Sequence, residues 1–233
     1  MKRLVQTRLE RFQSFSQAST QSLSNPSSES MRFHVHRNLR LSNIGFGAYR
    51  LKSPEPLIAA LNCGIHLIDT APNFEKGKSE CIIGDVLKDR FEAKISDRDQ
   101  LCIVTKSGYL DASCRWLNKI DSADTGKGHF HSLDPISIEA DLTQSLQRLR
   151  VEFVDVLMLN NPERMMLDSR QRRSSTQMED MIFKAFQHLG KEVERGMNRV
   201  FRLTCEQVES NHLEFAQTQW QIHYWTIMFL SLD

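Results

Sequence analysis

The sequence contains no uninterrupted run of about 18 or more apolar residues, the length that a membrane-spanning helix needs. The longest apolar stretch, residues 220–230, is interrupted by Gln221, His223 and Thr226, which suits a strand or a short core segment better. A transmembrane protein is therefore not expected, and we predict no membrane partner.

An excess of charge of either sign is also lacking, because the formal net charge is +1. A protein without a basic field has no general attraction for nucleic acid or anionic lipid, so we predict no nucleic-acid partner. Metal-ligand clusters are scarce as well: His34 and His36 have suitable spacing but no third ligand nearby, and no metal site is predicted.

Paired cysteines are the third absence. The five cysteines stand singly, without a CxxC pair or an even-numbered framework, which is typical of reduced thiols in an intracellular protein. They are Cys63, Cys81, Cys102, Cys114 and Cys205.

What is present is the composition of a globular protein, 40% hydrophobic and 25% charged over 233 residues, enough for one core. Residues 1–30 differ from this, being Arg-bearing, Ser-rich and nearly free of acids. That composition favours a transit peptide and a mitochondrial location, and the alternative is a disordered tail on a cytoplasmic protein. In either case we exclude the segment from the fold.

After a hairpin at residues 31–41, apolar strands alternate with amphipathic helices, which predicts an α/β fold with a parallel sheet. The predicted strands are 43–50, 65–68, 101–106, 153–159 and 199–203, with a sixth at 220–230. The predicted helices are 54–62, 79–90, 137–150 and 181–193.

Two segments are predicted to be irregular. Residues 107–133 are rich in Gly, Asp and Ser and are interpreted as a long loop over the mouth of the sheet. Tyr109, His129 and His131 belong to this loop. Residues 170–175 are interpreted as a solvated basic turn.

Two opposite charges end neighbouring buried strands. Asp69 follows the apolar run at residues 65–68, and Lys106 follows another at 101–105. A lysine at the end of a buried strand needs a partner, so we predict an ion pair with Asp69 at the edge where α/β proteins hold their active sites. The alternative is that Asp69 only caps the turn before Pro72.

Four stretches together resemble the aldo-keto reductases, which are NADP-dependent (β/α)8-barrel oxidoreductases. They are LIDTAPNFEKGKSECIIG (67–84), VTKSGYL (104–110), SLQRL (145–149) and DVLMLNNPE (155–163). The likeness runs from about residue 41 to 163 and fades by about 200. It implies a partial (β/α)8 TIM barrel over residues 31–203, with a divergent segment at 204–233.

The resemblance also assigns site residues. Asp69 and Lys106 match the family's catalytic Asp and Lys, whereas Phe74 stands where the family has its proton-donating Tyr, and Asn160 where it has His. Phe has no proton to give, and losing a general acid typically costs about 10²- to 10⁴-fold in rate. The resemblance therefore implies an impaired catalytic site.

The cofactor that the resemblance implies is NADP(H), with Gly45, Gly47 and Asn161 as its contacts. We expect weak binding, because the loops that grip the nucleotide's phosphates in the family follow strands that this sequence does not show. The expected function is NADPH-linked reduction of a small aldehyde or ketone, at a low or zero rate.

Two alternatives to that function stay open: a non-catalytic scaffold that binds a partner, and a truncated product without function. An incomplete barrel also exposes a strand edge, through which we expect two copies to pair as a homodimer.

Overall fold

A computed structural model describes residues 33–36, 39–111, 119–126, 128–168 and 173–204. The chain divides into two units, Met1–Phe33 and His34–Asp233, and the account below concerns the second. The predicted leader (1–30), the predicted sixth strand (220–230) and the C-terminal segment beyond Thr204 lie outside the described residues.

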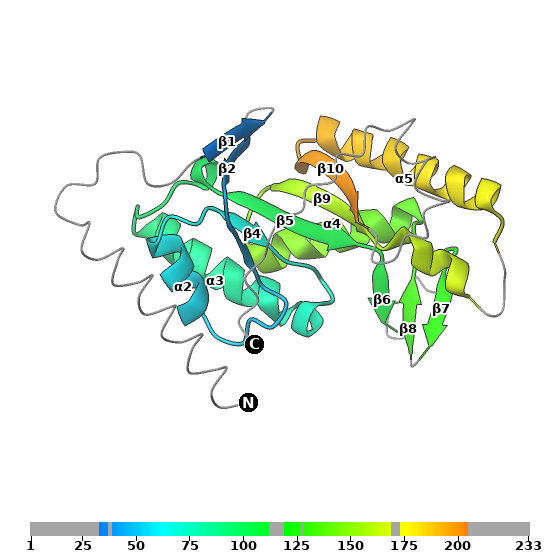
Figure 1. The fold of residues 1–233 in the computed structure, drawn as a ribbon, viewed down its shortest axis with the longest axis horizontal. Helices are drawn as coiled ribbons and strands as arrows, with labels where there is room; N and C mark the ends of the chain where they lie inside the picture. Colours follow the sequence, from blue (N-terminus) through cyan, green and yellow to red (C-terminus); the bar gives the residue numbers. More distant parts are fainter. Residues whose placement is uncertain (1–32, 37–38, 112–118, 127, 169–172, 205–233) are drawn as a thin grey trace. The chain divides into compact units, whose positions relative to one another are not determined.

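Five parallel strands form the central sheet, in the order β10-β9-β5-β4-β3 (Figure 1). They are β3 (Gly45–Gly47), β4 (Leu67–Asp69), β5 (Cys102–Ser107), β9 (Val154–Asn160) and β10 (Asn198–Thr204). Each strand of this sheet pairs with the sheet strand that precedes it in the sequence, as in a (β/α)8 barrel. The predicted partial barrel is confirmed, and within the described residues the sheet does not close into a ring.

Four helices connect these strands. They are α2 (Glu55–Asn62), α3 (Lys78–Glu92), α4 (Pro135–Leu149) and α5 (Ser175–Glu194). Three short 3-10 helices follow strands or turns: η1 (Phe74–Gly77), η2 (Arg98–Gln100) and η3 (Pro162–Leu167). Helix α3 packs on α4, α4 on β5, and α5 on β10, so the helices cover one face of the sheet.

Helix α5 begins earlier than the sequence predicted, at Ser175 instead of residue 181. Ser174 accepts a hydrogen bond from the backbone N–H of Gln177, whose side chain accepts one from the Ser174 N–H. This reciprocal capping box satisfies two N–H groups that a helix start otherwise leaves without partners. The polar first turn hid this start from a search for apolar periodicity.

The core lies on both faces of the strands. Ile103 and Leu157 pack with the helices, whereas Cys102, Val104 and Val156 form a second cluster on the other face. Because successive side chains of a strand point to opposite faces, burial on both sides requires an almost continuous apolar strand. The sequence of β5 and β9 therefore suits a covered parallel sheet.

The segment predicted as a long loop after β5 contains strands instead. An antiparallel sheet, in the order β6-β8-β7, is formed by β6 (Tyr109–Asp111), β7 (Ala123–Gly126) and β8 (His129–His131). These strands have three or four residues each and little apolar alternation, so their strand signal in the sequence is weak. The predicted N-terminal hairpin is present as β1 (Phe33–His36) and β2 (Leu39–Ser42).

Arg173 corrects the prediction of a solvated basic turn. Its guanidinium is buried, donating to the Met165 carbonyl (2.8 Å) and to Asp121 Oδ1 (2.5 Å). A buried Arg is stable where carboxylate and carbonyl oxygens meet its planar donors. The carboxylate of Asp121 lies 52 residues away in the sequence, so a local charge pattern cannot reveal it.

No helix among the described residues has both the length and the apolar character needed to cross a membrane.

Candidate functional site

The carboxyl ends of three neighbouring strands bring together the residues that the sequence singled out. Asp69 ends β4, Asn160 ends β9, and Lys106 is the penultimate residue of β5 between them. The parallel register places Gly47 beside Asp69, and Lys106 beside Met158. The α/β fold thus gathers these side chains at one edge of the sheet, where barrel enzymes build active sites.

Asp69 and Lys106 form the predicted ion pair. Lys106 Nζ lies 2.5 Å from Asp69 Oδ1 and also donates to the Thr70 carbonyl at 3.0 Å. Both residues are only 8% exposed. Burial raises the pKa of Asp69 above its ordinary value, and the positive charge of Lys106 offsets part of that rise. The alternative that Asp69 only caps a turn is therefore wrong.

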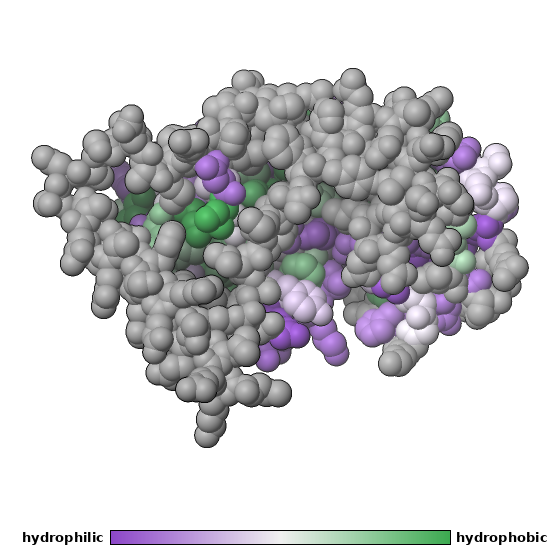
Figure 2. Space-filling model, viewed as in Figure 1, coloured by the Kyte–Doolittle hydropathy of each residue, from purple (hydrophilic) through white to green (hydrophobic). Residues whose placement is uncertain are grey.

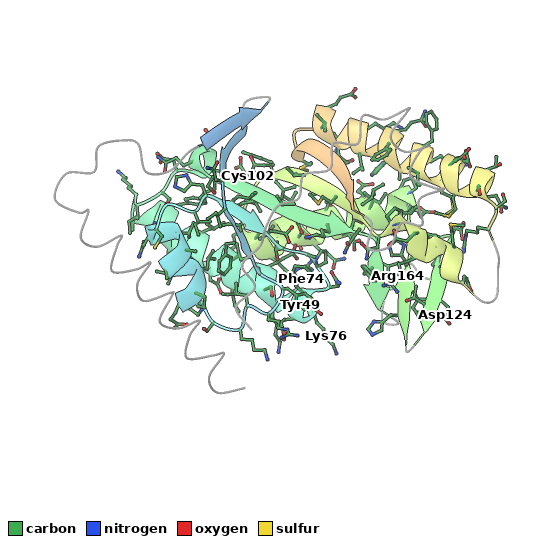
Figure 3. All side chains as sticks on the ribbon, viewed as in Figure 1. Tyr49, Phe74, Lys76, Cys102, Asp124 and Arg164 are labelled. Carbon is green, nitrogen blue, oxygen red and sulfur yellow. The ribbon has the colours of Figure 1, made fainter. Side chains whose placement is uncertain are left out.

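Phe74 packs against this pair. Its ring centroid lies 5.0 Å from Lys106 Nζ, and Tyr49 meets the Phe74 ring edge-on with centroids 5.1 Å apart. A cation beside the face of a ring is attracted to its π electrons. Phe74 thus occupies a place beside the ammonium without offering a proton, and Figure 3 shows it adjacent to Tyr49.

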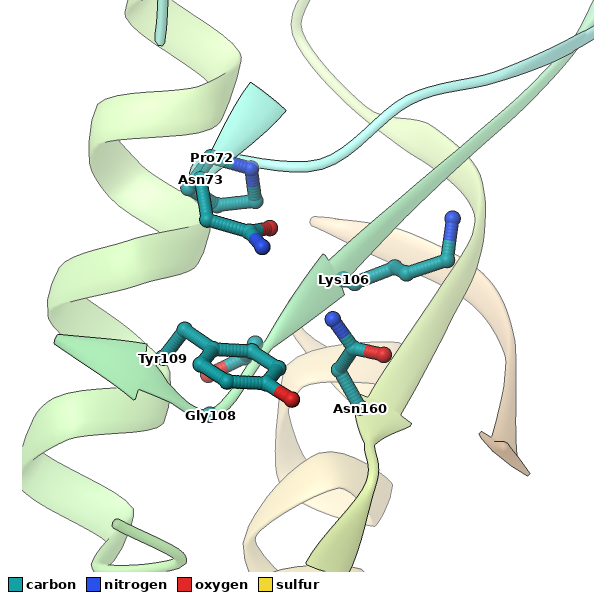
Figure 4. A pocket seen from close by; sticks show the side chains of 7 residues that line it. Pro72, Asn73, Lys106, Gly108, Tyr109 and Asn160 are labelled. Atoms are coloured by element: carbon teal, nitrogen blue, oxygen red, sulfur yellow. The ribbon is translucent and has the colours of Figure 1, made fainter. Parts of the chain in front are cut away.

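A small hollow lies at these strand ends, and its walls enclose no space large enough for a water molecule (Figure 4). Its polar walls are formed by the side chains of Lys106, Tyr109 and Asn160, together with Asn73. Sites for drug-sized ligands have volumes of about 300–1,000 Å³. The hollow therefore accommodates neither a carbonyl compound nor a dinucleotide unless its walls move apart.

A second hollow, of ≈ 310 Å³, lies on the other side of Asn73. Tyr49, Arg50, Lys52 and Glu75 line the rest of it, and all four are exposed. In the space-filling view, hydrophilic residues gather over the region where Tyr49 and Lys76 are labelled (Figures 2 and 3). The two hollows share Asn73, so the small hollow borders a polar, open surface.

Tyr109, which the sequence analysis placed in a loop over the mouth of the sheet, lies in β6 and in the wall of the small hollow. Sequence reasoning missed this strand. The available signal was Gly108 directly after Lys106-Ser107, because glycine after a strand often marks a sharp turn. Asn161, predicted as a cofactor contact, instead donates from Nδ2 to the Tyr109 hydroxyl oxygen at 3.2 Å.

His131 supports the site from behind. Its Nε2 lies 2.6 Å from the Asn160 carbonyl oxygen, and because a carbonyl only accepts, Nε2 carries a hydrogen. Burial lowers the pKa of His131 to about 4, although this hydrogen bond opposes the shift. The imidazole is therefore neutral near pH 7 and cannot act there as a cationic acid.

Asp141 has the opposite shift. It accepts hydrogen bonds from Ser107 Oγ (2.7 Å) and from the Gly108 N–H (3.3 Å). Burial raises its pKa to about 6, with these hydrogen bonds opposing the rise. Asp141 thus holds Ser107 and Gly108 from α4, whereas His131 binds the end of β9 from β8.

We expect variants of these two residues to respond to acid in opposite directions, relative to the wild type. Between pH 6.5 and 4 the His131 imidazole holds a proton in the unfolded state only, so His131→Gln should gain stability relative to the wild type as pH falls through this range. Between pH 6 and 3.8 the Asp141 carboxyl holds a proton in the folded state only, so Asp141→Asn should lose stability relative to the wild type as pH falls. The His131 contribution amounts to up to about 3 kcal/mol.

Urea denaturation of the wild type and both variants at pH 4.5 and 7.5 measures this difference. Parallel pH dependences in the two variants would contradict the assignment of these protonation states.

The two glycines predicted as cofactor contacts lie in β3, the outer strand beside β4. Gly47 is partly exposed and pairs with Asp69, whereas Gly45 is buried. Gly47 thus reaches the strand-end region and Gly45 lies deeper in the sheet.

A comparison with families of known proteins decides the identity. The model for the Aldo/keto reductase family matches residues 43–219, which include all five parallel strands and the strand-end residues. The chain belongs to the aldo/keto reductase family. Its Asp69 and Lys106 therefore stand in a family that uses nicotinamide cofactors.

Individual relatives match part of the chain. The NADH-specific methylglyoxal reductase of Escherichia coli is 35% identical over 105 residues, covering 45% of this chain and 29% of that protein. The aldo-keto reductase YhdN of Bacillus subtilis is 29% identical over 136 residues, covering 54% of this chain and 36% of that protein. The chain thus matches about a third of the length of these relatives.

Solved structures show the same fold. The aldo-keto reductase AKR11C1 from Bacillus halodurans, in its holo form, aligns with a TM-score of 0.61 at 18% identity. The alignment covers 83% of this chain and 56% of that one. This aldo/keto reductase chain therefore corresponds to about half of the fold of that solved reductase.

The donors at the strand ends suit the polar nicotinamide end of a cofactor, although the small hollow itself has no room for one. They are the amide of Asn160 and the ammonium of Lys106. Thr70 Oγ1, next to Asp69, is buried without a hydrogen-bond partner among the described residues. Buried polar atoms usually have a partner, so Thr70 offers a bonding position at the same edge.

Proposed function

We propose that this aldo/keto reductase chain carries out the NADPH-linked reduction of small aldehydes or ketones at a low rate. The observation that carries the proposal is the buried Lys106–Asp69 pair at the carboxyl ends of parallel strands, the edge where barrel enzymes build their active sites. A buried ion pair is weak evidence for stability alone, which favours a chemical role for it.

Reduction of a carbonyl group adds a hydride to carbon and a proton to oxygen. The bound nicotinamide supplies the hydride. Lys106 and Asn160 provide positive charge and a hydrogen-bond donor at the hollow where the carbonyl oxygen would gain negative charge. Phe74 cannot donate the proton, and this supports a rate that is low by about 10²- to 10⁴-fold.

Gly47, Asn161 and Thr70 are the residues we propose to hold the nicotinamide end of the cofactor, which binds weakly. The small hollow does not accommodate the rest of the dinucleotide. We keep NADP(H) as the proposed cofactor. The name of the Escherichia coli relative specifies NADH for that protein, so both cofactors belong in the test.

Cofactor fluorescence titrations and substrate-dependent oxidation test the proposal. We expect NADPH to bind with a dissociation constant well above micromolar, and its oxidation to require an added aldehyde such as methylglyoxal. Asn160→Leu, which removes the amide donor and retains the volume, should reduce this rate by about tenfold or more. Absence of oxidation with either cofactor would overturn the proposed reaction.

A non-catalytic scaffold is the second candidate. The observation in its favour is that Phe74 fills the position beside Lys106 with a ring that forms stable contacts but carries no proton. The same titrations separate the two functions, because a scaffold would show no aldehyde-dependent oxidation and no sensitivity to Asn160→Leu.

A further inference from the structure

The small hollow at the strand ends is closed from one side by the segment that follows β4. Pro72 and Asn73, from this segment, line it opposite Tyr109 and Asn160 (Figure 4). No water molecule fits between these walls, and Lys106, which also lines the hollow, is only 8% exposed. A ligand therefore reaches the Lys106 ammonium only if one of the walls moves.

The wall on the side of β5 and β9 is held firmly. A Cβ at Gly108 would lie 2.7 Å from His131 Nε2, so this turn has no space beside it. Asp141 accepts hydrogen bonds from Ser107 Oγ and from the Gly108 N–H, and the Ser132 N–H donates to the Gly108 carbonyl at 2.9 Å. The wall that can move is therefore the segment after β4.

That segment has an unfavourable backbone. Glu75 (φ 48°, ψ 34°) and Lys76 (φ 55°, ψ 45°) both lie in the left-handed region, directly before Gly77 at φ 83°. A residue with a Cβ is strained in this region, because the Cβ comes too close to the backbone carbonyl oxygen. Such conformations persist only where the surrounding structure holds them. The closed position of the segment is therefore strained.

Few contacts hold the two strained residues in place. Both side chains are exposed, and neither forms a hydrogen bond or an ion pair with any residue that the structure describes. The Lys76 N–H lies 3.4 Å from the Asn73 carbonyl oxygen, which is long for a hydrogen bond. The Phe74 ring, 5.0 Å from Lys106 Nζ, ties the segment to the strand ends. Loss of that contact would release both the strain and the wall.

The two ends of the segment are fixed. Thr70 is fully buried, and its N–H donates to the Val104 carbonyl at 2.9 Å. Gly77 is buried as well, and a Cβ there would lie 3.1 Å from Arg148 Cδ. Motion is therefore confined to residues 72–76, between β4 and α3.

We propose that residues 72–76 form a gate over the Lys106 ammonium. When the two strained residues leave the left-handed region, the Phe74 ring moves away from Lys106, and the closed hollow joins the open hollow of ≈ 310 Å³ beside it. The strain raises the free energy of the closed state, so the open state is populated without a ligand. The gate does not depend on the proposed reductase function, because its opening involves neither cofactor nor substrate.

Chemical labelling of lysine side chains in the full chain measures the gate. Formaldehyde and cyanoborohydride methylate accessible amines, and mass spectrometry follows each lysine separately. Lys106 should react more slowly than the half-exposed Lys88, at a rate set by the open population. Lys76→Gly removes the steric cost of the closed state, whereas the freedom of Gly in the open state offsets part of this gain. We therefore expect Lys106 labelling to slow by about two- to tenfold.

Lys94→Gly is the matched control. Lys94 is also exposed and left-handed, with φ 56°, but it follows α3 at the end opposite the gate. The same substitution there should raise thermal stability and leave the rate of Lys106 labelling within about twofold of the wild type.

Glu75→Gly tests the gate a second time, with slowing expected in the same range as for Lys76→Gly. Unaltered Lys106 labelling in both gate variants, or an equal slowing in Lys94→Gly, would overturn the gate. A Lys106 that reacts as fast as Lys88, or that does not react in the folded protein, would also overturn it. Thermal unfolding verifies that each variant is folded, and either gate variant suffices for the comparison with Lys94→Gly.

Discussion

Replacing Lys106 by Met should lower the free energy of unfolding by about 3–5 kcal/mol near neutral pH. The substitution leaves the Asp69 carboxylate buried without its cation, in a position where both side chains are about 10% exposed. Removing one partner of a buried ion pair destabilises a protein more than removing both partners, because the remaining buried charge keeps its full desolvation penalty. Urea denaturation at pH 7.5 measures the loss.

The double variant Asp69→Asn/Lys106→Met is the informative companion. It removes the solitary charge, so we expect it to recover about 2 kcal/mol relative to Lys106→Met alone. Lys88→Met serves as the matched control, because Lys88 forms an exposed pair with Glu92 at 3.5 Å, and its loss should change stability by less than about 0.5 kcal/mol. A double variant as unstable as Lys106→Met would contradict the buried-charge explanation.

The stability of Lys106→Met should also depend on pH. Burial raises the pKa of Asp69, and removing the ammonium raises it further. A carboxyl whose folded pKa exceeds its unfolded pKa binds a proton on folding in the range between the two values. The variant should therefore regain stability as pH falls through that range, and it should regain more than the wild type does.

Substituting Ala for Gly84 should be comparably damaging, for a steric reason. A Cβ at Gly84 in α3 would lie 2.1 Å from the Arg148 carbonyl oxygen and 2.8 Å from the Leu149 carbonyl carbon. Both are backbone atoms at the end of α4, so no side-chain rotation relieves the overlap. The helices must separate, and we expect a loss of about 3 kcal/mol or more, at the upper end of the range for overpacking.

Gly190→Ala provides a control for which we expect an increase in stability instead of a loss. Gly190 lies inside α5, and no heavy atom lies within 4 Å of the Cβ that Ala would add. Replacing an unobstructed helical glycine by Ala should raise stability by roughly 0.5–1 kcal/mol. Thermal denaturation of both variants compares them. A Gly84→Ala protein as stable as the wild type would mean that α3 and α4 do not touch in this way.

The separation of α3 and α4 should also disturb a buried network. Arg148 Nε donates to Glu80 Oε2 at 2.7 Å, and Glu80 Oε1 accepts from Thr105 Oγ1 at 2.7 Å. Thr105 directly precedes Lys106 in β5. A helix displacement at Gly84 therefore reaches β5 and Lys106 through three side chains, so we expect the Gly84→Ala chain to bind cofactor less well even where it remains folded.

The sequence by itself determined the parallel α/β fold and the ion pair. Strands that are apolar throughout must be covered on both faces, and a charge that ends such a strand needs an opposite charge at the same edge. This reasoning places Asp69 beside Lys106 without knowledge of the helices. The resemblance to the aldo-keto reductases, and not strand patterning, marks Phe74 and Asn160 as departures.

Only the tertiary structure decided where Tyr109 and Arg173 lie. Tyr109 is positioned by Gly108, which is held by Asp141 from a helix 33 residues later and by His131 from β8. Arg173 is buried by Asp121, 52 residues away in the sequence. Local propensity describes a residue and its near neighbours, whereas these positions depend on hydrogen bonds that form only after distant segments have packed together.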